Sequence, residues 1–286
     1  MNIEEKIRQY LDNSAGVNQW LCVLRKFKQV VGEKESYDSW DVLKFLRECE
    51  RKYKYKPNSL ATYIRILKRI YELAGWEWDK TRIRTPKVDS MEISKPRLPE
   101  ESVEKMINNS DRLNVYMRGL LFLSTIYGLR RVELSTIRKE DIDLEGKKIL
   151  IRTAKGGDKR WMRLPEAGCV ILEDWEPKDI DERNRGYLNV CFQAITFVTL
   201  GKIFRGHGWH DIRRELAVRL SPPHTSLSDY EIIQFMRWST GFGSSIQILQ
   251  EYRKSAGEPE KFEIDERVLE QHPFLKEWEK LYMRGP

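Results

Sequence analysis

Apolar residues recur with a helical period along most of the chain. Between residues 60 and 74 they follow the i, i+3, i+4, i+7 pattern, which predicts a helix with one buried face. Gly75 stands where the C-terminal cap of this helix is expected, and Asn58 or Ser59 can cap its start. The same period predicts three earlier helices, over residues 3–11, 17–31 and 40–53. The N-terminal part of the chain is therefore expected to be all helical.

The apolar period stops between residues 84 and 98, where Pro86 and Pro96 stand among several basic residues. Such a composition is typical of an extended linker. We therefore expect three regions: a helical domain over residues 1–83, a linker over 84–98 and a second domain over 99–286.

The second domain is expected to begin with a helix near Pro99, followed by a strongly apolar helix over 113–127 that ends at Gly128. After residue 142 the period changes from helical to alternating, which predicts two strands over 147–153 and 160–164. The residues between the strands include two adjacent glycines and form the turn of a hairpin. The rest reads as helical, with a last helix over 265–282. The predicted fold is mainly α with a small antiparallel β-sheet, in two domains.

The charge of the chain favours a polyanionic partner. One third of the residues are charged, and the net charge is +7. Nucleic acid is the commonest such partner, although a merely basic soluble protein has the same balance. Candidate DNA-binding residues lie on the polar face of the 60–74 helix and in a basic stretch just before it, where lysines alternate with tyrosines; they are Lys52, Lys54, Lys56, Arg65, Lys68 and Arg69. An ordinary solvated helix face is the alternative interpretation of these residues.

Several classes of protein are disfavoured by the sequence. No apolar run approaches the roughly 18 residues of a membrane span, and residues 1–6 lack the apolar stretch of a secretory signal. The four cysteines are scattered, and the four histidines show no metal-ligand spacing. We therefore expect a cytoplasmic protein with reduced thiols, no metal site and no cofactor.

Candidate chemistry is concentrated at three places. His210 and Arg213 lie three residues apart at a helix start, so they share one face, and they are a proton donor and an oxyanion clamp. Arg130 stands in a turn three residues before Glu133, which can orient it by a charge-assisted bond. Lys155 is expected at the tip of the hairpin. Taken alone, each of these is more often an ordinary structural or solvated residue.

The order of these motifs resembles the tyrosine recombinase family of the phage-integrase and Xer type. The resemblance runs from Gly-Leu-Arg-x-x-Glu-Leu through the hairpin lysine and His-x-x-Arg to a Trp and a late Tyr. It implies the catalytic set Arg130, Lys155, His210, Arg213, Trp238 and Tyr252, with Glu133 in support. The N-terminal helices are similar to the family's core-binding domain, so the likeness covers nearly the whole chain.

The resemblance implies a reaction on double-stranded DNA. Tyr252 would attack a phosphodiester and form a 3′-phosphotyrosine, while Arg130 and Arg213 clamp the non-bridging oxygens and Lys155 protonates the departing 5′ oxygen. With these cations a metal is not needed. The expected function is site-specific recombination, for integration or excision of a mobile element or for chromosome dimer resolution. Two alternatives stay open: a DNA-binding protein that has lost the chemistry, and an enzyme that relaxes DNA like a type IB topoisomerase.

Two departures from the family pattern stand out. Arg214 replaces the second histidine of a His-x-x-Arg-His motif, and the gap between Trp238 and Tyr252 is lengthened by a Gly/Ser-rich insertion. The insertion raises the hypothesis that Tyr252 reaches a neighbouring subunit. The resemblance also implies a tetramer on synapsed DNA from a chain that is monomeric in solution. The apolar C-terminal helix would then dock either on its own domain or on the next protomer.

Overall fold

The computed structural model describes residues 2–11, 14–86, 98–99, 101–152, 159–178, 180, 186–238 and 261–283. The chain divides into two compact units, Met1–Lys95 and Pro96–Pro286, and each unit has its own hydrophobic core. The division falls inside the stretch that the sequence predicts as a linker.

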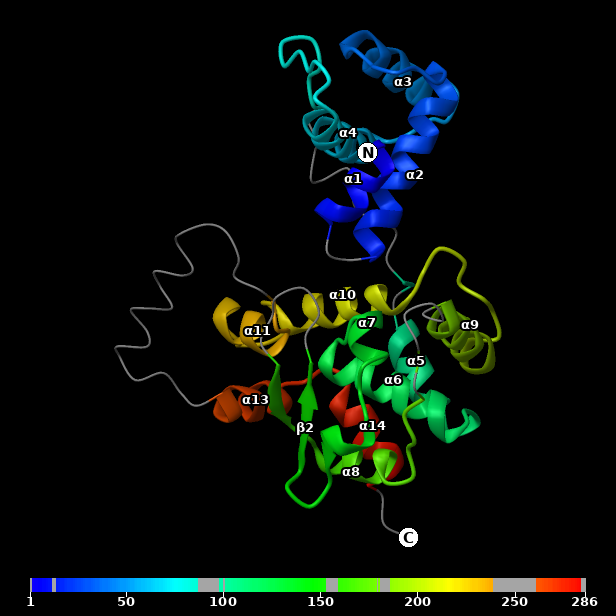
Figure 1. Cartoon of the computed structure of the whole chain (residues 1–286). Coiled ribbons are helices and arrows are strands. Elements are labelled where there is room, and N and C mark those ends of the chain that lie inside the picture. The colour runs from blue at the N-terminus through cyan, green and yellow to red at the C-terminus, as the bar shows by residue number, and fades with distance from the viewer. Residues whose placement is uncertain are drawn as a thin grey trace. The chain divides into compact units, whose positions relative to one another are not determined.

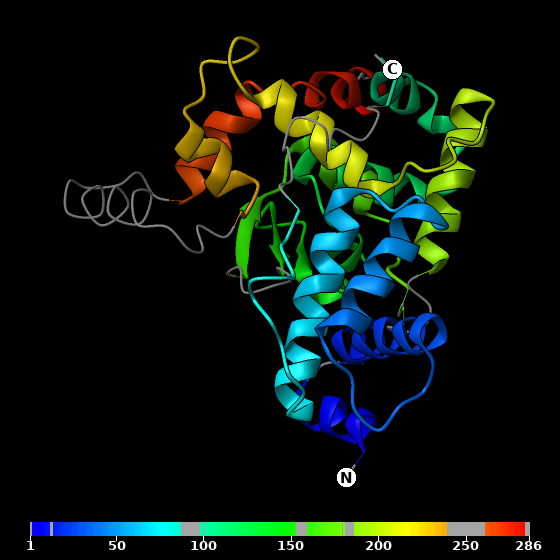
Figure 2. The same cartoon turned by 90° about the horizontal axis from the view of Figure 1, so that it is seen from above.

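Unit 1 is a bundle of four helices in its described part (Figure 2). They are α1 (Ile3–Tyr10), α2 (Ser14–Val31), α3 (Ser39–Arg51) and α4 (Pro57–Ala74). Phe27 of α2 meets Phe45 of α3 and Tyr71 of α4 edge to face, so one aromatic group joins three helices. Gly75 ends α4 with φ 75°, as predicted. The expected start is wrong: Lys56 is the N-cap, because Pro57 already has the φ of a first helical residue and needs no N–H partner.

Unit 2 is built around α6 (Val115–Tyr127), which is buried at every position from Gly119 to Tyr127. Helices α8 (Glu166–Leu172), α9 (Gly186–Leu200) and α10 (Trp209–Leu220) pack against it, as Figure 1 shows for α10 above α6. The other described helices before α13 are α5 (Ser102–Asn108), η2 (Ser110–Arg112), α7 (Arg131–Leu134), η3 (Lys139–Asp141) and α11 (Asp229–Phe235). The helix expected from Pro99 begins later, because Glu101 takes a left-handed φ of 59° as its N-cap.

The predicted hairpin is present and carries one extra strand. β2 (Lys148–Ile151) pairs antiparallel with β3 (Arg160–Arg163), and the short β1 (Ile142–Asp143) pairs with the other edge of β2. Ile149 faces Met162 across the ladder, and both side chains are buried in the unit 2 core. The turn of the hairpin, with Lys155, lies outside the described residues.

The last predicted helix is in fact two helices, α13 (Lys261–Glu270) and α14 (Leu275–Tyr282). Pro273 lies at the break, where its missing N–H and fixed ring interrupt a helix. Trp278 of α14 is fully buried, packs edge to face on Phe122 of α6, and donates its Nε1–H to Thr125 Oγ1 at 3.0 Å. Both helices therefore belong to the core of their own unit, the first of the two placements considered from the sequence.

Candidate active site

Arg130 and Glu133 form a closed pair at the start of α7. Arg130 is the N-cap, and its backbone N–H donates to Glu133 Oε2 at 2.8 Å while its Nη1 donates to Oε1 at 2.7 Å. One carboxylate thus holds both the main chain and the side chain of the same arginine. The Glu133 side chain is 0% exposed, whereas the Arg130 side chain is 30% exposed. The spacing Arg-x-x-Glu therefore fixes a guanidinium that still reaches solvent.

Gly128 makes the turn that delivers Arg130. It caps α6 in the left-handed region, with φ 57°. A Cβ at this position would lie 2.9 Å from Met236 Cε and 3.2 Å from Leu216 Cδ2. Glycine is therefore required twice, by backbone conformation and by the close approach of Met236.

The C-terminal end of α6 gathers three side chains from distant parts of the chain. The carbonyl of Gly128 accepts from Arg213 Nη1, that of Tyr127 from Arg237 Nη2 at 3.0 Å, and that of Ile126 bonds His272 Nε2 at 2.9 Å. The last carbonyls of a helix have no partner within the helix and carry partial negative charge. The C-terminal end of α6 therefore binds two guanidinium groups, those of Arg213 and Arg237.

Arg213 lies on α10 and is buried, with 2% of its surface exposed. Its Nη2 donates to the Met236 carbonyl at 2.5 Å, and its Nη1 lies 4.0 Å from Glu133 Oε2. Burial, followed by repulsion from Arg237 and Arg130, lowers its pKa to about 9. Arg213 therefore stays cationic at neutral pH.

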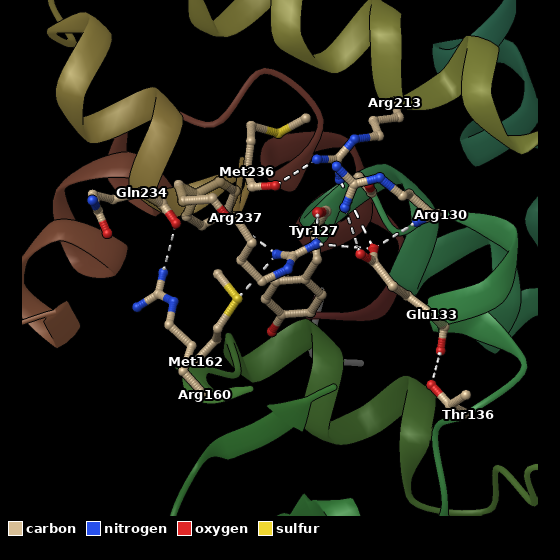
Figure 3. A network of polar contacts seen from close by, with 12 residues as sticks. Tyr127, Arg130, Glu133, Thr136, Arg160, Met162, Arg213, Gln234, Met236 and Arg237 are labelled. Atoms are coloured by element: carbon tan, nitrogen blue, oxygen red, sulfur yellow. Dashed lines mark hydrogen bonds and ion pairs between the residues drawn. The ribbon is translucent and has the colours of Figure 1, made fainter. Parts of the chain in front are cut away.

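The carboxylate of Glu133 has a third arginine partner, because Arg237 Nη2 lies 3.6 Å from Oε2. Figure 3 shows the three guanidinium groups pointing at this carboxylate from three elements. We call Arg130, Arg213 and Arg237 around Glu133 the arginine cluster. Three positive charges against one negative charge leave the cluster with a net attraction for an anion.

His210 and Trp238 lie beside Arg213. They line one cavity of about 290 Å³ with Arg213 and Arg214, which we call the α10 cavity. His210 is exposed, one helical turn before Arg213. The Trp238 side chain is 38% exposed, and its ring centroid lies 5.9 Å from Arg213 Cζ. A cation, an imidazole and an indole therefore face the same open space.

Lys155 and Tyr252 lie outside the described residues, but the segments that carry them are joined at their described ends. Arg160 of β3 pairs with the buried Asp265 of α13 at 2.6 Å, and its Nη2 also donates to the Gln234 carbonyl at 3.4 Å. Residues on both sides of the stretch 239–260 thus meet the strand that follows the hairpin turn. Tyr282, another tyrosine near the C-terminus, has its hydroxyl 3.1 Å from Ser110 Oγ and its ring beside Arg118.

Comparisons with known proteins show which chains this one is similar to. Residues 96–194 match the model of the phage integrase family. Tyrosine recombinase XerA of Pyrococcus horikoshii is 33% identical over 136 residues, which cover 46% of this chain and 44% of that protein. Over this part, the chain is similar to tyrosine recombinases. It spans about half the length of the curated relatives it matches.

Two solved structures of tyrosine recombinases share the fold. A lambda integrase dimer bound to a COC′ core site is 14% identical with a TM-score of 0.62, over 90% of this chain and 76% of that one. The XerH recombinase bound to difH substrate, in a pre-cleavage complex, is 17% identical with a TM-score of 0.56, over 85% and 80%. The family-model match includes Arg130 and Glu133 and ends before His210 and Arg213. In the structure, the contact between Arg213 and Glu133 joins the two pairs.

Unit 1 carries the residues predicted to bind DNA. Lys52, Lys54, Lys56, Arg65 and Arg69 are exposed, and Lys68 is half-buried. Arg69 pairs with Glu72 at 2.8 Å, so part of its charge is already compensated. Residues 65, 68 and 69 share one face of α4. That the exposed lysines and arginines of this face contact DNA stays a prediction.

The structure adds α2 to the basic surface, which the sequence analysis did not include. Lys26 Nζ lies 4.4 Å from the ring centroids of both Tyr53 and Tyr55, and it hydrogen-bonds the Tyr55 hydroxyl. Lys26, Tyr53 and the exposed Arg25 line a cavity of about 430 Å³. We call Lys26 with Tyr53 and Tyr55 the Lys26 cluster. In the sequence, the alternation of lysines and tyrosines at residues 52–56 indicated part of this cluster, whereas the helical pattern of α2 gave no sign of Lys26.

Across the described ranges, none of the helices is long and apolar enough to cross a membrane. Within the same ranges, no three His, Cys, Asp or Glu side chains are grouped so that they could hold a metal ion.

Proposed function

We propose that this protein is a site-specific DNA recombinase that cleaves and rejoins double-stranded DNA through a 3′-phosphotyrosine intermediate. The observation that carries the proposal is the arginine cluster, which joins Arg130 and Arg213 through Glu133. Arg213 of this cluster also lines the α10 cavity. The match of residues 96–194 to the phage integrase family model and the fold shared with DNA-bound recombinases support it.

The reaction follows from the charges. In the transition state, negative charge develops on the non-bridging oxygens of the phosphate, and fixed guanidinium forks stabilise it without reorganising. Arg130 and Arg213 serve this role, because Glu133 and the α6 carbonyls hold them before DNA arrives. His210 donates to the phosphate and exchanges a proton, and Trp238 packs on Arg213 or donates its indole N–H.

The remaining two roles belong to residues outside the described ranges. The Tyr252 oxygen forms a bond to phosphorus, and the bond from phosphorus to the 5′ oxygen breaks. Lys155 gives its proton to that oxygen, which leaves as a 5′-hydroxyl. A phenol has a pKa of about 10, so its proton must pass to an acceptor such as His210 during attack. Resealing reverses these steps with a 5′-hydroxyl from the exchanged strand.

Binding and assembly complete the proposal. Unit 1 holds the duplex through the basic face of α4 and the Lys26 cluster, chiefly by contacts to phosphates. Four copies assemble on two synapsed duplexes from chains that are monomeric in solution. The enzyme acts in the cytoplasm and serves integration or excision of a mobile element, or resolution of chromosome dimers.

The test traps the covalent intermediate. A pool of duplexes with a randomised core carries a nick a few nucleotides beyond the cleavage point, so that cleavage releases a short 5′-hydroxyl fragment and cannot reverse. Wild type and Tyr252→Phe are incubated with the pool in EDTA. Tyr230→Phe and Tyr282→Phe are tested beside them, because these two tyrosines are the rival candidates for the nucleophile. Adducts that survive SDS are then isolated and sequenced. We expect an adduct from every protein except Tyr252→Phe.

Other outcomes separate the alternatives. Salt-sensitive DNA binding without an adduct would reject the enzyme and favour a binding protein. Relaxation of a supercoiled plasmid by a monomer, without exchange between two duplexes, would favour the topoisomerase-like reading. An adduct lost only in Tyr230→Phe or Tyr282→Phe would keep the reaction and move the nucleophile.

A further inference from the structure

Arg237 occupies a position that normally belongs to glycine. Helix α11 ends with two bonds, from the Trp238 N–H to the Ile233 carbonyl at 3.1 Å and from the Arg237 N–H to the Gln234 carbonyl at 3.2 Å. These are the two hydrogen bonds of a Schellman motif, whose central residue is left-handed. Arg237 has φ 51°, a conformation that an L-residue with a Cβ adopts at an energetic cost.

The side chain of Arg237 adds a second cost, because its charge is buried. The side chain is 2% exposed. Nη2 donates to the Tyr127 carbonyl and Nη1 to the Phe235 carbonyl, each at 3.0 Å, and Nη1 lies 3.2 Å from Met162 Sδ. A buried cation is tolerated only where such partners are supplied. Strain and buried charge at one residue are characteristic of a functional position.

The partners of Arg237 indicate what that position does. Through the Tyr127 carbonyl it is fixed to the end of α6, one residue before the carbonyl that holds Arg213. Through Glu133 it meets the carboxylate that holds Arg130. Its backbone forms the turn that presents Trp238. Arg237 therefore contacts the groups that hold Arg130 and Arg213, and it does not line the α10 cavity.

We infer that Arg237 is a positioning residue of the active site, which holds the Glu133 carboxylate in place and thereby keeps Arg130 and Arg213 aimed at the scissile phosphate. This inference rests on the proposed function. It assigns to Arg237 a role that neither the sequence motifs nor the family resemblance includes.

The electrostatics of Glu133 agree with this role. Burial acts to raise the pKa of Glu133, and attraction to Arg237 is the largest of the influences that bring it below its usual value, ahead of the bonds and charge of Arg130. The charged groups that face Glu133 are Arg130 from its own turn, Arg213 from α10 and Arg237 after α11. Burial lowers the pKa of Arg237 to about 10, so it too is cationic at neutral pH.

The inference predicts a change in the pH profile of cleavage. In Arg237→Gln the pKa of Glu133 rises, so the carboxyl takes a proton at a higher pH and Arg130 loses its acceptor there. Single-turnover adduct formation should fall about 10- to 100-fold at neutral pH, as for other supporting groups of active sites. Its acid limb should move to higher pH, while the Kd for DNA stays within a few-fold of wild type.

Three control variants separate the guanidinium from the backbone. Arg237→Gly relieves the left-handed strain and removes the charge, so we expect it to be as slow as Arg237→Gln. Arg237→Lys keeps a cation and should recover part of the rate and the wild-type acid limb. Arg112→Met, at an exposed arginine of the same unit, should behave as wild type. A Gly variant as fast as wild type, or a Gln variant with an unmoved acid limb, would overturn the inference.

A stability measurement keeps the inference separate from the proposed function. Urea unfolding of wild type, Glu133→Gln, Arg237→Gln and the double variant forms a cycle that needs no DNA. We expect the double variant to lose less stability than the two single changes together, because each single change leaves a buried partner unpaired. If wild type forms no adduct, the proposed function fails. The stability cycle then still tests whether Arg237 and Glu133 interact. Additive effects in the cycle would reject the link between Arg237 and Glu133.

Discussion

Acidification should destabilise this protein through one histidine. His272 lies between α13 and α14 and is 2% exposed. Its Nδ1 accepts the Phe274 N–H at 3.2 Å, and a carbonyl can only accept, so Nε2 carries the proton and donates to Ile126. Both ring nitrogens are thus used by the neutral form. Burial accordingly lowers the pKa of His272 from 6.5 to about 4.

The sign and size of the effect follow from linkage. The unfolded chain binds the proton near pH 6.5 and the folded chain only near pH 4, so the stability contribution is complete above pH 6.5 and is lost as the pH falls toward 4. Each unit of pKa difference corresponds to about 1.4 kcal/mol. Between pH 7 and pH 5 the free energy of unfolding should therefore fall by about 2 kcal/mol on account of His272 alone.

The measurement compares urea unfolding of wild type and His272→Gln at pH 7 and pH 5. Glutamine can donate an amide N–H to the Ile126 carbonyl and does not titrate, whereas the carboxylates titrate in both proteins. The difference between the two pH dependences then reports His272. We expect wild type to lose about 2 kcal/mol more than the variant. Equal losses, or a His272 pKa near 6.5 by NMR titration, would refute the reasoning.

Further predictions concern the site, the turn, the basic face and the delivery of the nucleophile. Arg130→Ala or Arg213→Ala should slow adduct formation about 10²- to 10³-fold in single-turnover assays, with DNA binding kept; an unchanged rate would remove that residue from the reaction. Gly128→Ala should lower the free energy of unfolding by about 1–3 kcal/mol in urea, because it adds both strain and a clash with Met236; a stabilised variant would contradict this. Lys68→Ala should reduce the slope of log K against log salt by about 1, whereas Lys105→Ala in unit 2 should not. Mixing Tyr252→Phe with Arg130→Ala protein should restore cleavage if Tyr252 acts in the active site of a neighbouring subunit. If the mixture shows no cleavage, Tyr252 acts in the active site of its own chain.

Much of the fold could be predicted because its signals are local. The apolar period located α4 and α6, and alternation located β2 and β3. The errors arose where one residue overrides the period. Pro273 splits the last predicted helix into two. Pro57 is the first residue of α4, so the helix begins before Asn58 and Ser59, which were expected to cap it. β1 is two residues long, too short to show an alternating pattern.

The site divides in the same way. Arg130 with Glu133 and His210 with Arg213 are pairs three residues apart, so spacing on a helix could reveal them. Arg237, which contacts the groups that hold both pairs, could not be found in this way. From sequence alone, an arginine just after the end of a helix is expected to be exposed to solvent. Its burial depends on the carbonyl of Tyr127, which lies 110 residues earlier in the chain. Such contacts exist only after the tertiary structure has formed.

The gathered end of α6 has a consequence for synthesis. His272 bonds a carbonyl 146 residues earlier, and Trp278 bonds a hydroxyl 153 residues earlier. These contacts join residues that are far apart in the chain. Such contacts form late in folding, because the entropy cost of closing a long loop must be met before the contact contributes any stability. On the ribosome, α6 and its arginine neighbours emerge well before residues 272–278 that complete their support. A chain that ends before residue 272 therefore lacks two of the side chains that hold the end of α6, and we expect its arginine cluster to be less firmly fixed than in the full chain.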